Sequence, residues 1–210
     1  MINAELFVSL LRPEATRRET IAFCESLLGK AAPCILPAWV AVALDTLEGS
    51  ETPVATVIGW PYGAAPAQAL GVEAAMATAD GAQHLILCPN LSALKSSAEL
   101  LVADAVQTVV DAAGPAEAEV TLWLPWEQLK PLERKSLVQL ALECGASGVL
   151  LPVADKESAQ ALRAFLDEEV GLMVLTHTGA EAQEMEACGA TALLLPDDSP
   201  LAKEVLGAPA

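Results

Sequence analysis

The sequence is poor in positive charge. Of its 210 residues, 11 are lysine or arginine and 28 are aspartate or glutamate, which gives a formal net charge of −17. This imbalance disfavours binding to nucleic acid or to anionic membranes, since both are held by positive charge. We interpret this excess of acidic residues as a solubility feature or as an adaptation to a salt-tolerant host. We therefore expect neither a nucleic-acid partner nor a membrane partner.

Signals for a membrane, a secretion pathway or a metal are also lacking. The longest nearly apolar run, Cys34–Leu44, is too short to span a bilayer and contains a proline. Glu5 precedes the first short apolar stretch and no basic segment comes before it, so a signal peptide is not indicated and we expect a cytoplasmic protein. The five cysteines form no CxxC pair, which favours buried reduced thiols over disulfides or a zinc site. Nothing in the sequence indicates a cofactor.

What the sequence does contain is a strict alternation of short apolar runs and longer amphipathic stretches. Strands are predicted at 6–11, 33–36, 54–58, 84–88, 120–124, 148–152, 172–176 and 192–195. Helices are predicted between them, near 16–28, 37–47, 65–79, 98–113, 131–144, 157–168, 180–188 and 200–206. Thr16 and Glu19 form a T-x-x-E capping box at the first helix. Alternation of this kind predicts a parallel sheet that is buried on both faces.

The number of repeating units decides between two parallel architectures. Three helix-to-strand junctions share one pattern, "DGAQHLIL", "CGASGVLL" and "CGATALLL", in which a glycine ends the helix. They fall on the fourth, sixth and eighth units, as a cyclic array would place them. Eight units favour a single-domain (β/α)8 TIM barrel over residues 1–210, with an open sheet as the alternative that no GxGxxG motif supports. Function is then expected in the loops that follow the strands.

Several motifs resemble the deoxyribose-phosphate aldolase family. "ATVIGWPYGA" and "GAQHLILCPNLSALKSS" carry the likeness, and it extends through "SLLRPEAT", "PCILPAWV", "GASGVLL" and "CGATALLL" in the same order along nearly the whole chain. The resemblance implies a class I aldolase barrel. Such enzymes cleave 2-deoxyribose 5-phosphate to acetaldehyde and glyceraldehyde 3-phosphate through a lysine Schiff base.

The same resemblance implies that the catalytic groups are missing. The Schiff-base lysine falls at Leu150, the second lysine at Met173 and the fourth-strand aspartate at Ile86. The first-strand aspartate falls near Phe7, and a polar position of the fifth strand is occupied by Trp123. We expect these five apolar side chains to fill the barrel as a core, because lysines without their carboxylate partners would be costly to bury. No residue of this chain is therefore assigned as catalytic.

The phosphate site that the resemblance implies is altered as well. The loop after the eighth strand reads "LLPDDSP", where Asp197 and Asp198 would repel a phosphate and Pro196 has no N–H to donate. Phosphosugar binding at this place is therefore doubtful.

Some residues near the expected mouth of the barrel remain candidates for contacts with a ligand or a partner. Trp60, Tyr62, Trp123 and Trp126 are half of the eight aromatic residues and follow or end the third and fifth strands. They are interpreted either as a plug of the former sugar pocket or as an apolar cleft or protein-binding surface. The polar candidates are Asn90, His177, Asp197 and Asp198, of which the last three are a weak signal for a metal site.

Three hypotheses for function follow from the sequence. The first, which we favour, is an aldolase homologue without Schiff-base catalysis that binds or assembles with a partner, including a second copy of itself. The second is a barrel enzyme that uses loop residues such as His177, Asn90, Asp197 and Glu127. The third is an aldolase with a displaced lysine such as Lys156, which would need desolvation to become nucleophilic.

Overall fold

The computed structural model describes residues 2–207, and its eight strands close into one parallel barrel in chain order. The strands are β1 (Glu5–Leu10), β2 (Ala32–Ile35), β3 (Ala55–Ile58), β4 (His84–Leu87), β5 (Glu119–Trp123), β6 (Gly148–Leu151), β7 (Gly171–Leu175) and β8 (Ala192–Pro196). β8 pairs with β1 to complete the ring, with Phe7 opposite Leu194. The predicted (β/α)8 barrel is thereby confirmed.

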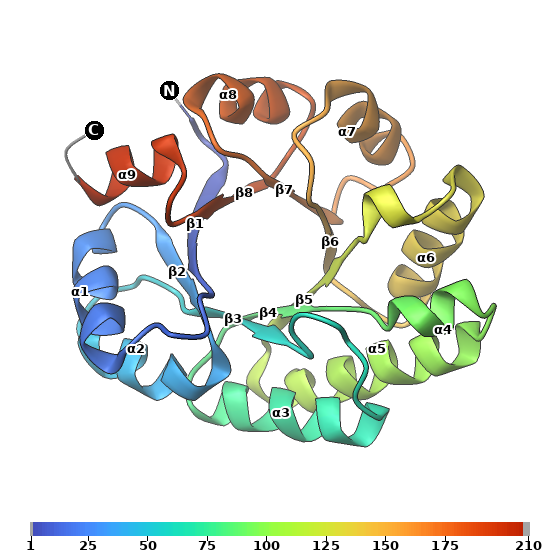
Figure 1. The fold of residues 1–210 in the computed structure, drawn as a ribbon, viewed down its shortest axis with the longest axis horizontal. Coiled ribbons are helices and arrows are strands. Elements are labelled where there is room, and N and C mark those ends of the chain that lie inside the picture. The colour runs from blue at the N-terminus through green and yellow to red at the C-terminus, as the bar shows by residue number, and fades with distance from the viewer. Residues whose placement is uncertain (1, 208–210) are drawn as a thin grey trace.

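Helices form a ring around the barrel (Figure 1). They are α1 (Arg17–Leu27), α2 (Val40–Thr46), α3 (Ala67–Ala79), α4 (Leu91–Lys95), α5 (Glu99–Ala113), α6 (Pro131–Glu143), α7 (Lys156–Arg163), α8 (Gly179–Ala187) and α9 (Pro200–Leu206). Short 3-10 turns lie at η1 (Pro37–Trp39), η2 (Gly114–Ala116) and η3 (Trp126–Gln128). Among residues 2–207, no helix is both long enough and apolar enough to cross a membrane.

The local signals read from the sequence act as predicted. The Thr16 hydroxyl accepts the Glu19 N–H, and the Glu19 carboxylate accepts the Thr16 N–H, so the capping box is formed. Gly81, Gly145 and Gly189, the glycines of the three repeated junctions, all have positive φ. At each junction the next alanine donates its N–H to a carbonyl five residues back, which ends the helix and turns the chain into the strand.

Several boundaries differ from the prediction. The segment 37–47 is divided between η1 and α2, and the short helix α4 was not predicted. The helix predicted to run to residue 168 ends at Arg163. The reason is that the Arg163 guanidinium donates to the carbonyl oxygens of Asp167 and Val170, which stabilises a turn in place of further helix.

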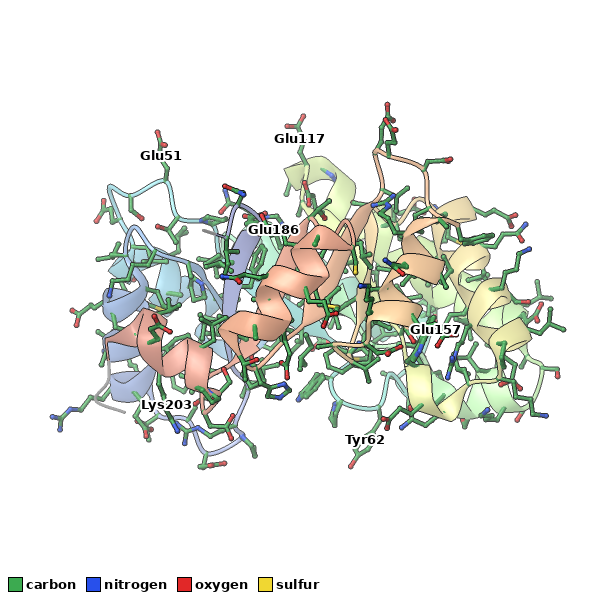
Figure 2. All side chains as sticks on the ribbon, turned by 90° about the horizontal axis from the view of Figure 1, so that it is seen from above. Glu51, Tyr62, Glu117, Glu157, Glu186 and Lys203 are labelled. Carbon is green, nitrogen blue, oxygen red and sulfur yellow. The ribbon has the colours of Figure 1, made fainter. Side chains whose placement is uncertain are left out.

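The barrel has two ends that differ in what the chain places there. Each helix begins at the end where the preceding strand stops, which is the functional end in this fold. Figure 2 shows Tyr62 at this end, whereas Glu51 and Glu117 lie at the opposite edge. We call these the C-terminal end and the N-terminal end of the barrel. One apolar core lies between the sheet and the helices, and a second, smaller one lies inside the barrel.

Candidate functional site at the C-terminal end of the barrel

The inside of the barrel is filled by apolar side chains. Phe7, Ile86, Leu150 and Met173 belong to one buried cluster, and the half-buried Trp123 packs against it. Leu150 and Phe7 are fully buried. The pairing register of the strands brings these side chains together, because Leu150 of β6 lies opposite Trp123 of β5 and Met173 of β7. The five positions singled out by the family resemblance thus lie together in the barrel interior.

Three polar side chains near this interior, Ser9, Cys34 and Cys88, are either hydrogen-bonded or hard to ionise. The Ser9 hydroxyl donates to the carbonyl oxygen of Leu195 at 3.3 Å. Burial raises the pKa of the Cys34 thiol to about 12, and burial likewise raises the pKa of the Cys88 thiol to about 12. Since the thiolate is the nucleophilic form, neither cysteine is activated at neutral pH.

Two tryptophans meet over the barrel at its C-terminal end. The rings of Trp60, in the loop after β3, and Trp123, at the end of β5, pack edge to face with centroids 5.4 Å apart and an interplanar angle of 70°. Trp60 is 36% exposed, so one side of the ring pair contacts solvent and the other is buried. Tyr62 lies beyond it and is 78% exposed. Trp123 therefore packs against the interior and Trp60 packs on Trp123, whereas Tyr62 is exposed to solvent.

The loop that carries Trp60 and Tyr62 is held tightly against the end of β4. Gly63 has φ +58°, and a Cβ at this position would lie 2.2 Å from the carbonyl oxygen of Cys88. The Gly63 N–H donates to the carbonyl oxygen of Gly59 at 2.6 Å, and the Gly59 N–H donates to the Glu73 carboxylate at 2.9 Å. Glycine at 63 is therefore required by close approach of two backbones, and it fixes the position of the aromatic pair.

A cavity of about 350 Å³ lies beside the aromatic pair, at the ends of β3 to β6. Its walls are mostly apolar or aromatic, and the polar side chains are Glu127 and Gln128. The lining residues are Pro61, Tyr62, Cys88, Pro89, Leu91, Trp123, Pro125, Glu127, Gln128, Pro152 and Val153. A cavity of this size and lining fits a small ligand held mainly by apolar contact.

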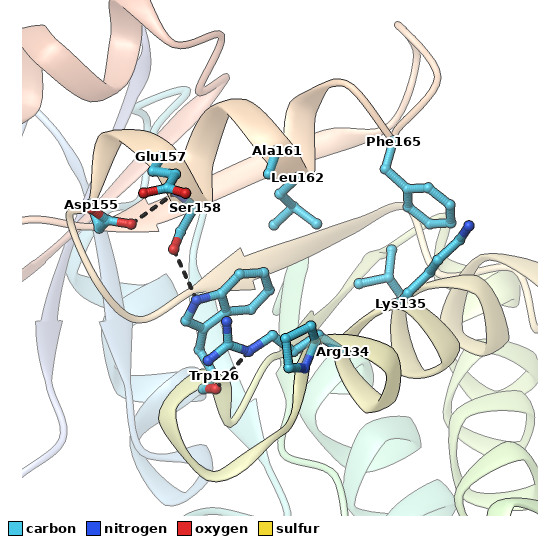
Figure 3. Close-up of a pocket in the computed structure, with 11 residues that line it drawn as sticks. Trp126, Arg134, Lys135, Asp155, Glu157, Ser158, Ala161, Leu162 and Phe165 are labelled. Atoms are coloured by element: carbon cyan, nitrogen blue, oxygen red, sulfur yellow. Dashed lines mark hydrogen bonds between the residues drawn. The ribbon is translucent and has the colours of Figure 1, made fainter.

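The structure places Trp126 apart from the aromatic pair, where it lines a separate cavity of about 530 Å³ between α6 and α7. Its ring does not line the cavity at the mouth but is buried between α6 and α7, where it belongs to the core outside the sheet (Figure 3). The indole N–H donates to the Ser158 hydroxyl at 3.0 Å, and the Arg134 guanidinium lies 4.3 Å from the ring centroid. Trp126 anchors two helices and takes no part in the aromatic pair. The reason is that it follows the strand end by three residues, in η3, where strand alternation no longer applies.

The predicted polar candidates do not converge on one site. Asn90 caps α4 by accepting the Ala93 N–H at 3.0 Å. The His177 ring lies 3.9 Å from the Glu181 carboxylate, and Asp197 pairs with Arg12 at 3.2 Å. Asp198 is exposed. Within residues 2–207, no group of three or more His, Cys, Asp or Glu side chains is placed to hold a metal ion.

Lys156, considered as a substitute for the Schiff-base lysine, lies outside the barrel interior, and so does Lys95. Lys95 forms an ion pair with Glu133 at 3.0 Å, which joins α4 to α6. Lys156 is the first residue of α7 and is exposed to solvent. A Schiff-base lysine needs desolvation to become nucleophilic, and the exposed position of Lys156 does not supply it.

The N-terminal end of the barrel holds a polar cavity that sequence reasoning missed. It has a volume of about 290 Å³, and its lining includes Glu5, His84, Glu119, Glu169 and Thr121. His84 Nδ1 lies 3.4 Å from the Glu119 carboxylate, and the His84 ring packs edge to face on Phe7. As the first residue of β4, His84 lies at this end of the barrel. The sequence did hold a signal for this cavity. The first residues of β1, β4 and β5 are all polar, and the alternation of side chains along each strand points them into the barrel.

Comparisons with known proteins decide the family. A deoxyribose-phosphate aldolase of Enterococcus faecalis is 30% identical over 204 residues, which cover 90% of this chain and 90% of that protein. The chain belongs to the deoxyribose-phosphate aldolase family. A relative of the same name from Geobacillus is 34% identical over 143 residues, so the match spans 67% of this chain but 64% of that relative. The family models that were compared with the sequence gave no match.

Solved structures support the fold. The structure described as a unique tetrameric deoxyribose phosphate aldolase from Aeropyrum pernix superposes with a TM-score of 0.81. The two chains are 23% identical, and the superposition covers 97% of this chain and 88% of the other. At that identity the likeness shows a shared barrel, and the arrangement of groups inside this barrel has to be taken from its own residues.

Proposed function

We propose that this member of the family forms no Schiff base and serves as a binding or assembly protein. The observation that carries the proposal is the apolar cluster inside the barrel, which contains Leu150 and Met173 at the places of the family's two lysines. Schiff-base catalysis needs a lysine amine that loses its proton near neutral pH, through desolvation or a neighbouring cation. Neither a lysine nor a neighbouring cation occupies the two positions in this chain.

Packing supports the proposal further. Leu150 is fully buried and Met173 is 5% exposed, so their side chains occupy the volume that a sugar would need. Trp123 packs against the same interior at the C-terminal end, and the Trp60 ring packs on Trp123. A substrate would therefore have to displace well-packed apolar groups before it reached any reacting atom.

The loops that bind phosphate in this family are also changed here. Asp197 lies after β8, where its carboxylate forms an ion pair with Arg12 at 3.2 Å. Pro196 has no N–H to offer to an anion. The proposed ligand of the 350 Å³ cavity is accordingly a small uncharged molecule or an apolar side chain of a partner, in contact with Tyr62 and the proline walls.

A barrel enzyme that works from its loops is the second candidate, and one observation favours it. Glu127 lines the 350 Å³ cavity and is not engaged in an ion pair among the described residues. The other loop residues considered for this role are used elsewhere, Asn90 as a helix cap and His177 beside Glu181. Catalysis from the loops would need a second group that converges on the Glu127 carboxylate. A single carboxylate therefore supports this alternative less strongly than the packed interior supports the absence of a Schiff base.

Cleavage of 2-deoxyribose 5-phosphate tests the proposal. Release of glyceraldehyde 3-phosphate would be followed by a coupled assay, with the Enterococcus faecalis relative at equal concentration as the control. We expect no release above that of buffer with this chain. Turnover that is saturable in substrate would overturn the proposal, and its loss in Lys156→Gln would assign it to the displaced lysine. A Glu127→Gln variant separates the loop-based alternative, because it leaves the interior unchanged.

A further inference from the structure

A cavity of about 530 Å³ lies outside the barrel, between α6 and α7 (Figure 3). We call it the α6–α7 cavity. It shares no lining residue with the 350 Å³ cavity at the ends of β3 to β6, so the two are separate. Much of its wall is apolar, with Trp126, Val138, Leu162 and Phe165 among the lining residues. A cavity of this size and lining can hold a small organic molecule.

The α6–α7 cavity carries positive charge, although the chain as a whole carries −17. Arg134 and Lys135 both line it, and each lies against an aromatic ring. The Arg134 guanidinium is 4.3 Å from the centroid of the Trp126 ring, and Lys135 Nζ is 5.3 Å from that of the Phe165 ring. Among residues 2–207, neither cation forms an ion pair with a carboxylate. Both are therefore available to an anionic group of a ligand.

The Arg134 guanidinium is already held in place. It is half-buried, and its Nε–H donates to the Trp126 carbonyl oxygen at 2.9 Å. The Trp126 ring beneath it is fixed in turn, because its indole N–H donates to the Ser158 hydroxyl at 3.0 Å. No hydrogen bond among the described residues uses Nη1 or Nη2 of Arg134. Two adjacent nitrogens of a fixed guanidinium match the two oxygens of a carboxylate, and little side-chain freedom is lost when they bind it.

Two carboxylates of the cavity limit the charge of a ligand. Asp155 and Glu157 lie at the start of α7, whereas Lys135 and Phe165 lie at the other end of the cavity (Figure 3). Both carboxylates are exposed, so water and salt screen them. That of Asp155 also accepts the Ser158 N–H at 2.8 Å as the cap of α7, where the helix dipole favours negative charge. A second negative charge on the ligand would be repelled at this end, so a single carboxylate is favoured over a phosphate or a dicarboxylate.

We propose that the α6–α7 cavity binds a small monocarboxylate with an aromatic or similarly flat apolar body. The carboxylate oxygens accept hydrogen bonds from the free Nη atoms of Arg134 and from Lys135 Nζ. The apolar body packs on Leu162 and on the Phe165 ring, which is 38% exposed without a ligand. The proposal goes beyond the function proposed above, because this cavity lies outside the barrel and involves neither its interior nor its mouth.

Three probes with the same ring and different charge test the proposal: 2-naphthoate, 2-naphthamide and 2-naphthylmethylammonium. Each is titrated into the full chain, and the NMR signals of the Trp126 indole N–H and the Arg134 Nε–H are followed. We expect 2-naphthoate to shift both signals saturably, and the neutral amide to bind at least about tenfold more weakly. The ammonium should bind more weakly still. Salt should weaken the binding of 2-naphthoate, because it screens the attraction to the two cations.

Two pairs of variants locate the binding. Ala161→Glu adds a carboxylate inside the cavity and should weaken 2-naphthoate at least about tenfold, whereas Gln160→Glu adds one on the same helix outside the lining and should not. Lys135→Gln should weaken it about threefold, whereas Lys203→Gln removes an equal charge on α9 and should leave binding unchanged. All four side chains are exposed, so the fold should be retained.

Several results would overturn the proposal. They are the absence of a saturable shift at either signal, an amide or ammonium probe that binds as tightly as 2-naphthoate, and equal dissociation constants within the Ala161→Glu and Gln160→Glu pair. None of the probes carries an aldehyde, and none reads Schiff-base chemistry. An active aldolase that binds 2-naphthoate in the α6–α7 cavity would therefore refute the proposed function alone, and an inactive chain that fails to bind it would refute this proposal alone.

Discussion

The two ends of the barrel differ in polarity in the opposite sense to that usual for this fold, with apolar side chains at the C-terminal end and polar ones at the N-terminal end. The C-terminal end, where barrel enzymes keep their reacting groups, is covered by Trp60 and Trp123 above an apolar interior. The N-terminal end, which ordinarily contributes stability, holds a cavity with Glu5, His84, Glu119 and Glu169. The contrast teaches that the barrel can keep its shape around an apolar interior at the end where barrel enzymes place their reacting groups, because strand pairing and the outer core do not depend on polar side chains there.

The largest expected effect comes from placing a charge in the interior below the C-terminal end. Leu150→Lys removes a fully buried leucine and puts an ammonium group into the apolar cluster, so we expect the free energy of unfolding to fall by about 4 kcal/mol or more. The matched change at the N-terminal end is Thr121→Lys, in a cavity that Glu5, Glu119 and Glu169 also line. It should cost about 1 kcal/mol or less, because the ammonium has carboxylates nearby. Urea unfolding measures both, and equal losses would contradict the contrast between the ends.

A smaller effect is expected from removing the cover of the mouth. Trp123→Ala deletes a half-buried ring that packs on Trp60 and on the interior cluster, and should lower the free energy of unfolding by about 2 kcal/mol. Tyr62→Ala, which removes a ring that is 78% exposed, should change it by less than about 0.5 kcal/mol. Thermal and urea unfolding provide the measurement. Equal stability of the two variants would show that Trp123 contributes no packing energy at the C-terminal end.

The smallest expected effect is the loss of stability when the pH is lowered. Hydrogen bonds from Thr16 lower the pKa of Glu19, hydrogen bonds from the Lys130 N–H and Lys95 lower that of Glu133, and hydrogen bonds from Ser158 lower that of Asp155. A carboxylate whose pKa is lowered by folding adds stability above its unfolded pKa, and this stability is lost as the pH falls through the folded value. Stability should therefore decline below about pH 4.5.

These three carboxylates lie at the starts of α1, α6 and α7, which are all at the C-terminal end. Acid should accordingly speed hydrogen exchange in the first turns of these helices before it affects the strands. Glu133→Gln should make the unfolding midpoint less sensitive to pH below about 4.5 than it is in the wild-type chain. An unchanged pH dependence in this variant would show that the Glu133 cap contributes nothing.

Much of the fold was predictable from the sequence, for local reasons. Apolar runs of strand length alternate with helical stretches, and Gly81, Gly145 and Gly189 mark helix ends where positive φ is needed. Thr16 and Glu19 identify a helix start by a reciprocal hydrogen bond that spacing alone reveals. The resemblance to the family, and not alternation, assigned Phe7, Ile86 and Leu150 to the interior together, because these strands carry apolar side chains on both faces.

The loops after the strands were less predictable, because alternation ends with the strand. Trp126 turns away from the mouth in η3 and is held by Ser158, a partner 32 residues away. His177 and Asp197 were considered together as metal ligands, but in the structure they interact with other residues. His177 lies beside Glu181, and Asp197 forms an ion pair with Arg12. Sequence spacing did not predict either interaction. The polar cavity at the N-terminal end was missed for a different reason. Its residues come from several strands and loops that are adjacent only once the barrel has closed.

The central claim is that no lysine of this chain condenses with an aldehyde at the place where its family reacts. The most direct measurement is mass spectrometry with peptide mapping after borohydride reduction in the presence of acetaldehyde, beside the Enterococcus faecalis relative. The account predicts slow, substoichiometric alkylation spread over exposed lysines such as Lys156 and Lys30, and a rapid single adduct in the relative. One fast, stoichiometric adduct on a single lysine of this chain would contradict it and would identify the working residue.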